Sequence, residues 1–244
     1  MATQVLEQVK CWLDSYDLSG DLNAVAIAQT VEQQEATTFG SDTRITKPSL
    51  KTIKASLAGL INLGAGLSEE FLSSKLTLAD VPLTIGPQTG AEGEPGISFL
   101  ASLASFNPVS GKIGDLLNFA LDAAATNSKL LRGTIGHNAL RTTTGTGTIF
   151  NLGAVPAGQF LYGVLHVPAI VGGPTVTIKI QSAATGGFGS PTDRITFTAV
   201  TTKGSQWAVP IGGAITDAFW RVTWTFAGGS TPSITFIVNI AIQP

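Results

Sequence analysis

The chain has 244 residues, of which 12% are charged and 43% hydrophobic, with a net charge of −2 and a mean hydropathy of +0.30. An average soluble domain has roughly 25% charged residues, so we expect both that much of this surface is buried against partners and that the remainder is covered by Thr, Ser, Asn and Gly. The weak negative charge argues against a dedicated nucleic-acid binder, and a single cysteine excludes an internal disulfide.

The two most apolar stretches are too short to span a membrane. Residues 159–171 and 234–242 fall well below the ~20 residues of a membrane-spanning helix. The first twelve residues include Glu7 and Lys10 and lack the basic-then-apolar order of a signal peptide. We therefore expect no membrane association and synthesis in a cytoplasm.

The first half of the chain predicts mainly strands. Residues 23–30 have the pattern of a strand, whereas 50–60 fit either a strand or a helix. Residues 113–125 have a helical composition but also fit a buried strand, which the family resemblance below favours. A Gly/Pro-rich stretch at 86–96 predicts a long loop of the kind that tends to be functional or mobile.

One short helix is predicted after the second of these strands. Ser68 has the residue type of an N-cap, and Glu69 and Glu70 follow in the first turn, where the helix dipole favours acids. The helix should end before Pro82.

Alternating apolar and polar residues predict four strands in the second half of the chain, because successive side chains of a strand point to opposite faces. These strands cover 175–180, 194–200, 220–226 and 234–242, with glycine-containing turn signals between them. Short strands at this spacing indicate a sandwich or barrel.

A faint internal repeat relates two segments. Residues 36–46 echo residues 186–196, since both contain Phe-Gly-Ser and end in Arg-Ile-Thr. A duplicated β unit would have this pattern, and so would chance in a chain rich in Thr and Gly. We expect one protomer over 1–244, divisible into β subdomains at 1–140 and 145–244.

Charge is unevenly distributed along the chain. Residues 1–42 carry one base and seven acids, a net charge of −6, whereas 43–150 carry nine bases and seven acids and 151–244 carry four bases and two acids, +2 in each case. This arrangement allows an acidic surface of one copy to meet a basic surface of the next. Ordinary solvated charge would give the same pattern.

The sequence contains no catalytic constellation. Nucleophilic catalysis needs a Ser or Cys beside a base such as His, and neither His137 nor His166 lies near a nucleophile motif. We expect His166 to lie in a strand and His137 in a loop. Two histidines and one cysteine do not provide a zinc site, so we expect no enzyme activity, no cofactor and no metal.

Three tryptophans allow two interpretations. Trp207, Trp220 and Trp224 are residues that can stack on a sugar, as in a carbohydrate-binding site. Trp220 and Trp224 alternate on one face of a predicted strand, which favours a place in the core.

A series of short motifs runs through most of the chain: Asp-Leu-Ser-Gly at 17–20, Thr-Thr-Phe-Gly at 37–40, Ser-Leu-Ala-Gly at 56–59, Leu-Arg-Gly at 131–133 and Arg-Ile-Thr-Phe-Thr at 194–198. In this order they resemble the tail tube (major tail) proteins of long-tailed bacteriophages. The chain departs from the family pattern at Ser49, where relatives have Gly after a proline, and after Gly59, where they have an acid. None of these motifs carries chemistry.

The resemblance implies an all-β protomer with one short helix, a β-sandwich or barrel of the tail-tube type. Such protomers form rings, usually hexamers, which stack into a hollow tube in the tail of the virion. DNA passes through the tube during genome ejection without specific binding. Other tail proteins, such as a tape-measure protein, are the further partners that the resemblance implies.

In that family a long loop between early strands crosses to the adjacent ring. By its order in the chain, the segment 30–42 is the candidate for this loop, and a solvated hairpin is the alternative. The candidate inter-ring contacts are Glu32, Gln33, Gln34, Glu35, Thr37 and Thr38. The alternative function is a virion or surface β-sandwich that binds carbohydrate or a receptor, and an enzyme ranks below both.

Overall fold

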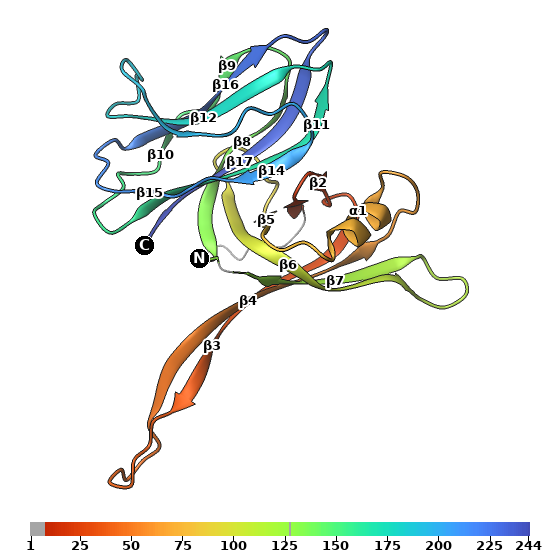
Figure 1. Cartoon of the computed structure of the whole chain (residues 1–244), viewed down its shortest axis with the longest axis vertical. Coiled ribbons are helices and arrows are strands. Elements are labelled where there is room, and N and C mark those ends of the chain that lie inside the picture. The colour runs from red at the N-terminus through yellow and green to blue at the C-terminus, as the bar shows by residue number, and fades with distance from the viewer. Residues whose placement is uncertain (1–7, 127) are drawn as a thin grey trace. The chain divides into compact units, whose positions relative to one another are not determined.

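The computed structural model of the chain describes residues 8–126 and 128–244. It is all β apart from one short helix, as the sequence predicts (Figure 1). Two compact units are present: unit 1 contains the described residues up to Gly20 with Val81–Leu100 and Lys129–Pro244, and unit 2 contains Asp21–Asp80 and Ala101–Ser128. The boundaries of these units differ from those of the predicted subdomains 1–140 and 145–244. The division into those subdomains stays a prediction.

Unit 1 is built from two β-sheets. In the first sheet β14, β11, β17 and β8 are neighbours in that order, followed by the start of β6 and then β5, β1 and β2, and β15 pairs with β11. In the second sheet the order is β10-β16-β12-β13, and β9 pairs with β16. The strands are β1 (Lys10–Leu13), β2 (Tyr16–Asp17), β5 (Val81–Gly86), β6 (Pro95–Ser110), β8 (Leu131–Arg141), β9 (Gly145–Thr146), β10 (Phe150–Asn151), β11 (Phe160–Val171), β12 (Thr175–Ala183), β13 (Thr192–Thr196), β14 (Gly204–Trp207), β15 (Ile211–Gly212), β16 (Phe219–Ala227) and β17 (Ser233–Gln243).

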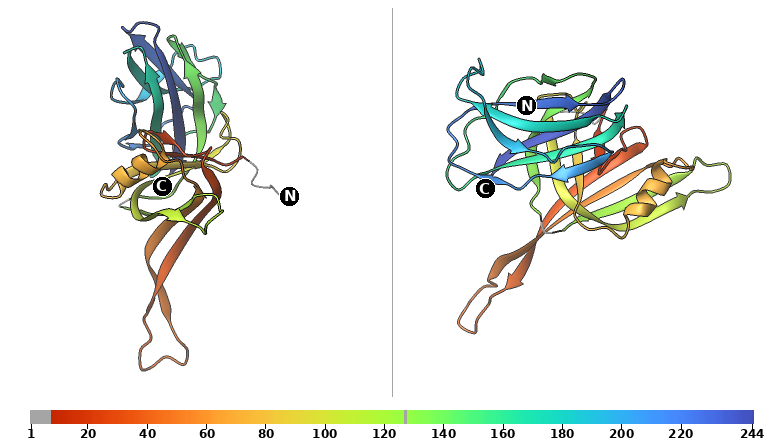
Figure 2. Two further views of the ribbon diagram at one scale, coloured as in Figure 1. Left: turned by 90° about the vertical axis from the view of Figure 1, so that its right-hand side faces the viewer. Right: turned by 45° about the horizontal axis from the view of Figure 1, so that its top comes forward.

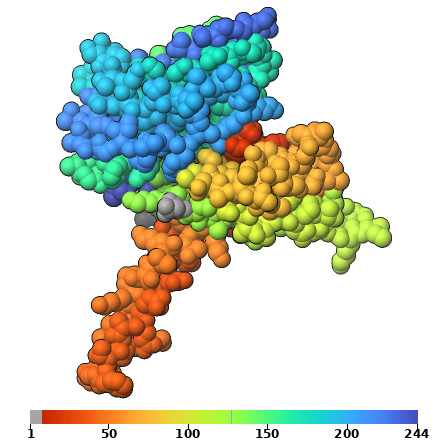
Figure 3. All heavy atoms as spheres, viewed as in Figure 1, coloured from red at the N-terminus to blue at the C-terminus, as the bar shows by residue number. Residues whose placement is uncertain are grey.

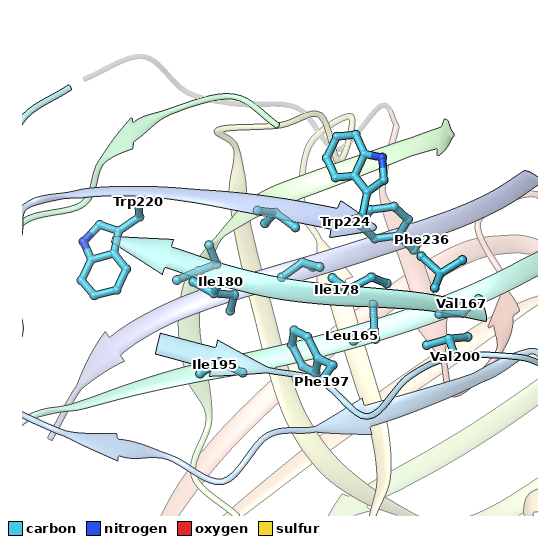
Figure 4. Close-up of a cluster of buried hydrophobic side chains, with 14 of the residues drawn as sticks. Leu165, Val167, Ile178, Ile180, Ile195, Phe197, Val200, Trp220, Trp224 and Phe236 are labelled. Atoms are coloured by element: carbon cyan, nitrogen blue, oxygen red, sulfur yellow. The ribbon is translucent and has the colours of Figure 1, made fainter. Parts of the chain in front are cut away.

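The core of unit 1 lies between these two sheets (Figure 4). β12 and β16 pair antiparallel with Ile178 opposite Trp224, and both side chains are buried. β11 and β17 contribute residues such as Leu165 and Phe236 from the other sheet to the same cluster. The predicted alternation in β12, β16 and β17 is therefore confirmed, since in each strand the apolar row faces a common core.

The glycine turn between β11 and β12 has a steric cause. Gly172 has φ +83°, and a Cβ at this position would lie 2.4 Å from the carbonyl oxygen of Ser230. The backbone NH of Ser230 donates to the carbonyl of Gly172 at 2.9 Å. Only glycine combines this conformation with so close an approach.

Unit 2 is a sheet in the order β3-β4-β7-β6 with helix α1. Its elements are β3 (Leu22–Glu35), β4 (Thr46–Leu60), α1 (Ser68–Lys75), the second part of β6 and β7 (Asn118–Ala125). Both ambiguous segments are therefore strands, since 50–60 lies in β4 and the larger part of 113–125 lies in β7. Ala55 and Leu57 of β4 are buried, whereas the intervening Ser56 is exposed.

Two local predictions were wrong. The N-cap of α1 is Leu67, because Ser68 is buried in the first turn and its hydroxyl accepts the backbone NH of Asn62 at 3.1 Å. His137 lies in β8 and not in a loop. Its neighbour Gly136 gave the segment the composition of a loop, but this glycine makes room for the core, since a Cβ there would lie 2.7 Å from Cδ1 of Ile240.

We predict that Trp224→Ala lowers the free energy of unfolding by about 3–5 kcal/mol, the usual cost of deleting a large buried aromatic. Trp224 is 3% exposed, packs against Phe236 with ring centroids 5.5 Å apart, and donates its indole NH to the carbonyl of Thr143 at 2.8 Å. Chemical denaturation measures the change. Trp207→Ala is the control with a smaller expected loss because Trp207 is half-buried, and a wild-type midpoint for Trp224→Ala would contradict the core assignment.

Candidate assembly surface

The outer part of the β3–β4 hairpin is a two-stranded ribbon, residues 30–52, which we call the arm (Figures 1 and 3). β4 pairs with β7 only from Lys54 to Leu60, so within the described residues β3 is the one strand partner of β4 along the arm. Figure 2 shows the same ribbon from two further sides. An isolated two-stranded hairpin is marginally stable in water, so the arm is a segment that would gain stability from a partner.

The tip of the arm is closed by local hydrogen bonds. The NH of Ala36 donates to the carbonyl of Ile45 at 2.8 Å, and the NH of Ile45 donates to the hydroxyl of Thr37 at 3.0 Å. The NH of Ser41 donates to the carbonyl of Thr38 at 3.0 Å. These bonds define a turn that holds Phe39 at the end of the ribbon.

Large apolar side chains of the arm face solvent. Phe39 is fully exposed, at 115% of its reference area, and Leu50 is 71% exposed. Val31 and Ile45 are also exposed. Four large exposed apolar side chains on one thin ribbon favour an interaction site, because a partner that covered them would remove apolar surface from water.

The arm as a whole is electrically neutral. Its acids are Glu32, Glu35 and Asp42, and its bases are Arg44, Lys47 and Lys51, three of each. Arg44 pairs with Glu35 at 2.9 Å. The acidic character of the leading segment is therefore cancelled here by the returning strand, and the arm does not form the acidic surface that residues 1–42 taken alone indicate.

The six candidate contact residues divide into two groups. Glu35, Thr37 and Thr38 make contacts within the arm, to Arg44, Ile45 and Ser41 respectively. Glu32, Gln33 and Gln34 lie in β3, are exposed, and have no side-chain partner among the described residues. Their side chains are the ones available to a neighbouring molecule, and their role as inter-ring contacts stays a prediction.

β3 also has an open edge. Over Leu22–Glu35 its one strand partner within the described residues is β4. The backbone groups on its other side are therefore available to a further strand, as at any unpaired edge. Sequence reasoning missed this feature, because alternation identifies a strand but not the number of its neighbours.

The buried histidine His166 belongs to a polar chain inside unit 1. Its Nδ1 lies 2.9 Å from the carbonyl oxygen of Asp14, which can only accept, so Nδ1 carries the proton. Nε2 then accepts from the hydroxyl of Thr84 at 2.7 Å. The Thr84 oxygen accepts from Ser98 at 2.7 Å, and Ser98 accepts from the amide of Asn239 at 2.7 Å.

This chain is sealed from solvent and its hydrogen bonds all run in one direction. Thr84, Ser98, His166 and Asn239 are all buried. Burial lowers the pKa of His166 to about 4, although its hydrogen bond to Asp14 acts in the opposite direction. The arrangement brings a hydroxyl to a histidine, but no substrate could reach it, and its effect is to hold five segments of unit 1 together: the β1–β2 turn, β5, β6, β11 and β17. The predicted place of His166 in a strand is confirmed.

His137 occupies a second polar site in unit 1. Its Nδ1 lies 2.6 Å from a carboxylate oxygen of Glu92, and its Nε2 accepts from Nε of Arg141 at 3.2 Å. The ring packs on Trp224 and Phe236, with centroids 4.7 and 4.3 Å away. Burial lowers the pKa of His137 to about 4, against the influence of Glu92. Glu92 comes from the Gly/Pro-rich loop between β5 and β6, so this contact anchors that loop.

Within 8–126 and 128–244, His, Cys, Asp and Glu side chains form no group of three that could hold a metal ion. In the same residues, no helix combines the length and the apolar composition needed to cross a membrane. Trp220 and Trp224 are buried, so these two do not form a platform for a sugar.

No protein-family model and no curated protein matches the chain. Among solved structures, it is similar to a protein of the native gene transfer agent virion, with a TM-score of 0.42 and 14% identity over 52% of this chain and 98% of that one. It is also similar to the Dit protein (gp 19.1) of phage SPP1, a hub adsorption apparatus protein, with a TM-score of 0.39 and 13% identity over 98% and 100% of the two chains. A chain of the phage p2 baseplate in its activated conformation gives a TM-score of 0.31 and 8% identity over 97% and 98%. All three are parts of virions or of phage adsorption apparatus, and all three TM-scores are below 0.5.

We predict that unit 1 loses stability as the pH falls from 7 to 5. Both histidines have folded-state pKa values of about 4, below the ordinary value of about 6.5. The unfolded chain therefore binds protons first, and each histidine should cost about 2 kcal/mol of folding free energy by pH 5.

Denaturation of wild type and His166→Gln at pH 7 and pH 5 measures this effect. Glutamine can still donate and accept, and the variant should lose about half of the pH dependence. Unit 2 contains no histidine, so its unfolding should not change over this interval. An identical pH dependence in variant and wild type would show that His166 is not held neutral in the fold.

Proposed function

We propose that this chain is a structural protein of a phage virion that assembles with copies of itself into rings, and that the rings stack into the tube of the tail. The observation that carries the proposal is the arm, a neutral two-stranded ribbon with exposed Val31, Phe39, Ile45 and Leu50. A tail tube serves as the conduit for DNA ejection, and a hexamer is the ring expected from the sequence resemblance.

The arm supports contact between successive copies. A surface that projects from one molecule meets a different surface on the next, which is a heterologous contact that repeats into rings or filaments. Glu32, Gln33 and Gln34 supply polar groups for this contact, and Phe39 supplies the large apolar group at its end. Permanent interfaces of this kind bury large areas and are more apolar than ordinary surface, in keeping with the low content of charged residues.

The open edge of β3 supports closure of a ring. A strand of another copy that paired with Leu22–Glu35 would satisfy the free backbone groups and extend the sheet from one molecule to the next. Main-chain pairing of this type gives affinity without requiring particular side chains. Ring closure would also remove the exposed edge that invites unspecific aggregation.

The exposed face of the unit 2 sheet is compatible with the passage of DNA without specific binding. Ala26, Ser56 and Asp122 are cross-strand partners on this face. The hydroxyls of Ser56 and Ser105 donate to Asp122 at 2.6 and 3.1 Å, and these bonds lower the pKa of the carboxyl. Among the described residues of β3, β4 and β7 on this face Lys54 is the one base, so the face lacks the cluster of bases that would hold phosphates.

We predict that replacing residues 31–51 by Asn-Gly leaves a folded protein that does not form tubes. Thr30 and Thr52 are cross-strand partners, and Asn-Gly forms the two-residue turn that joins such a pair. Negative-stain microscopy over a range of concentrations should show rings or tubes of uniform diameter for wild type and separate particles for the variant.

A mixing experiment separates loss of the arm from loss of the fold. The shortened chain should still accept the arm of a wild-type neighbour, so adding it to wild type should shorten the tubes. Tubes built from the shortened chain alone would rule out the arm as the stacking element. Wild-type rings that never stack would instead favour a hub role, and a wild-type monomer at every concentration would refute self-assembly altogether.

A further inference from the structure

The outer face of the second sheet in unit 1 carries a row of polar side chains. β12 and β16 pair with Gln181 opposite Arg221 and Lys179 opposite Thr223, and Thr146 of β9 lies on the other side of Thr223. The residues that alternate with them in β12 and β16 are buried in the core. These five side chains therefore share the face that points away from the core.

Arg221 is held in a fixed orientation on this face. Its Nε donates to the side-chain oxygen of Gln181 at 3.0 Å, and the guanidinium lies 4.3 Å from the centroid of the Phe188 ring. Stacking on an aromatic ring together with a bond at Nε leaves the two terminal nitrogens directed elsewhere. No described residue accepts a hydrogen bond from either of them, and no described carboxylate pairs with Arg221.

The neighbouring cations each pair with a carboxylate, whereas Arg221 does not pair with a carboxylate of any described residue. Nζ of Lys179 lies 2.6 Å from Asp193, and a terminal nitrogen of Arg194 lies 3.0 Å from Asp217. The hydrogen bond from Lys179 is the main cause of the lowered pKa of Asp193. Arg221 is thus a half-buried cation with two terminal nitrogens that are available to an anion.

Phe188 is held in a strained backbone conformation beneath this guanidinium. Its φ is +49°, in the left-handed region that bulky residues rarely adopt. Phe188 is 7% exposed, and its backbone NH donates to the carbonyl of Thr185 at 3.2 Å. Strain of this kind persists where surrounding structure enforces it, and it is concentrated at ligand-binding positions.

We propose that Arg221 is an anion-binding site and that its ligand is an acidic saccharide. The two terminal nitrogens match the two oxygens of a carboxylate or a phosphate, which they would bind side by side. Thr223 and Thr146 on the same face provide hydroxyls that can donate to and accept from the hydroxyls of a sugar. The site lies within unit 1 and does not depend on the arm, so it is independent of the tube proposal.

Binding of the full-length protein to immobilised polymers tests the proposal. The surfaces carry polygalacturonate as the saccharide with carboxylates, phosphomannan as the saccharide with phosphates, and dextran as the neutral polysaccharide. Wild type should bind at least one of the two acidic polymers and not dextran. Arg221→Gln should weaken this binding by about tenfold or more, as expected for the loss of charge-assisted hydrogen bonds.

Two further variants make the test specific. Lys203→Gln removes one positive charge from an exposed position of the same unit and should leave binding within about twofold. Arg221→Lys keeps the charge but loses the planar fork, so its binding should fall between wild type and Arg221→Gln. Equal weakening by Arg221→Gln and Lys203→Gln, equal binding to dextran, or no binding of wild type to either acidic polymer would overturn the proposal.

Discussion

The need of every strand to satisfy its backbone hydrogen-bonding groups is the constraint on which this structure depends. In unit 1 the central strands have neighbours on both sides and bury one face in a common core. Unit 2 meets the same requirement only in part, because within residues 8–126 and 128–244 β3 has one strand partner over its 14 residues and the arm is two strands wide. We therefore expect another molecule to bind where backbone hydrogen-bonding groups lack a partner strand, at the edge of β3 and along the arm.

Contact with other copies would also account for the low content of charged residues. A chain with 12% charged residues has few means of keeping its copies apart in solution. Much of the apolar material is used in the core of unit 1, where Trp220 and Trp224 are buried with their indole NH groups bonded to backbone carbonyls. Some of the exposed apolar side chains lie on the arm, whose charges cancel and therefore do not oppose close approach between copies.

Strands whose burial pattern is visible in neighbouring residues could be predicted from the sequence. Features that depend on distant residues could not. Val222 and Trp224 alternate with Arg221 and Thr223, so β16 and its buried face could be identified from sequence. Ile53 and Leu57 could have belonged to a helix, and pairing with β3 and β7 decided for a strand. His137 was misassigned because the need for Gly136 arises from Ile240, a residue more than 100 positions away.

The candidate site was only partly predictable for the same reason. Glu32 to Thr38 were predicted as contacts of a stacking loop over 30–42 in an acidic segment, but Arg44, Lys47 and Lys51, which neutralise the arm, follow later in the chain. The open edge of β3 could not be predicted, because a local sequence pattern does not show that β4 is its one strand partner in the described part of the chain. Arg221 is an ordinary strand arginine in the sequence, and its distinctive feature arises from the backbone conformation of Phe188.

The directed chain from Asn239 through Ser98 and Thr84 to His166 has a consequence for how this protein can diverge. Each member donates to the next, so exchanging Ser98, Thr84 or His166 for an apolar residue would leave a buried donor on one side and a buried acceptor on the other without partners, and exchanging Asn239 would leave the Ser98 oxygen without its donor. Single steps away from this arrangement are therefore disfavoured, and the four positions should change together in descendants of this sequence or not at all.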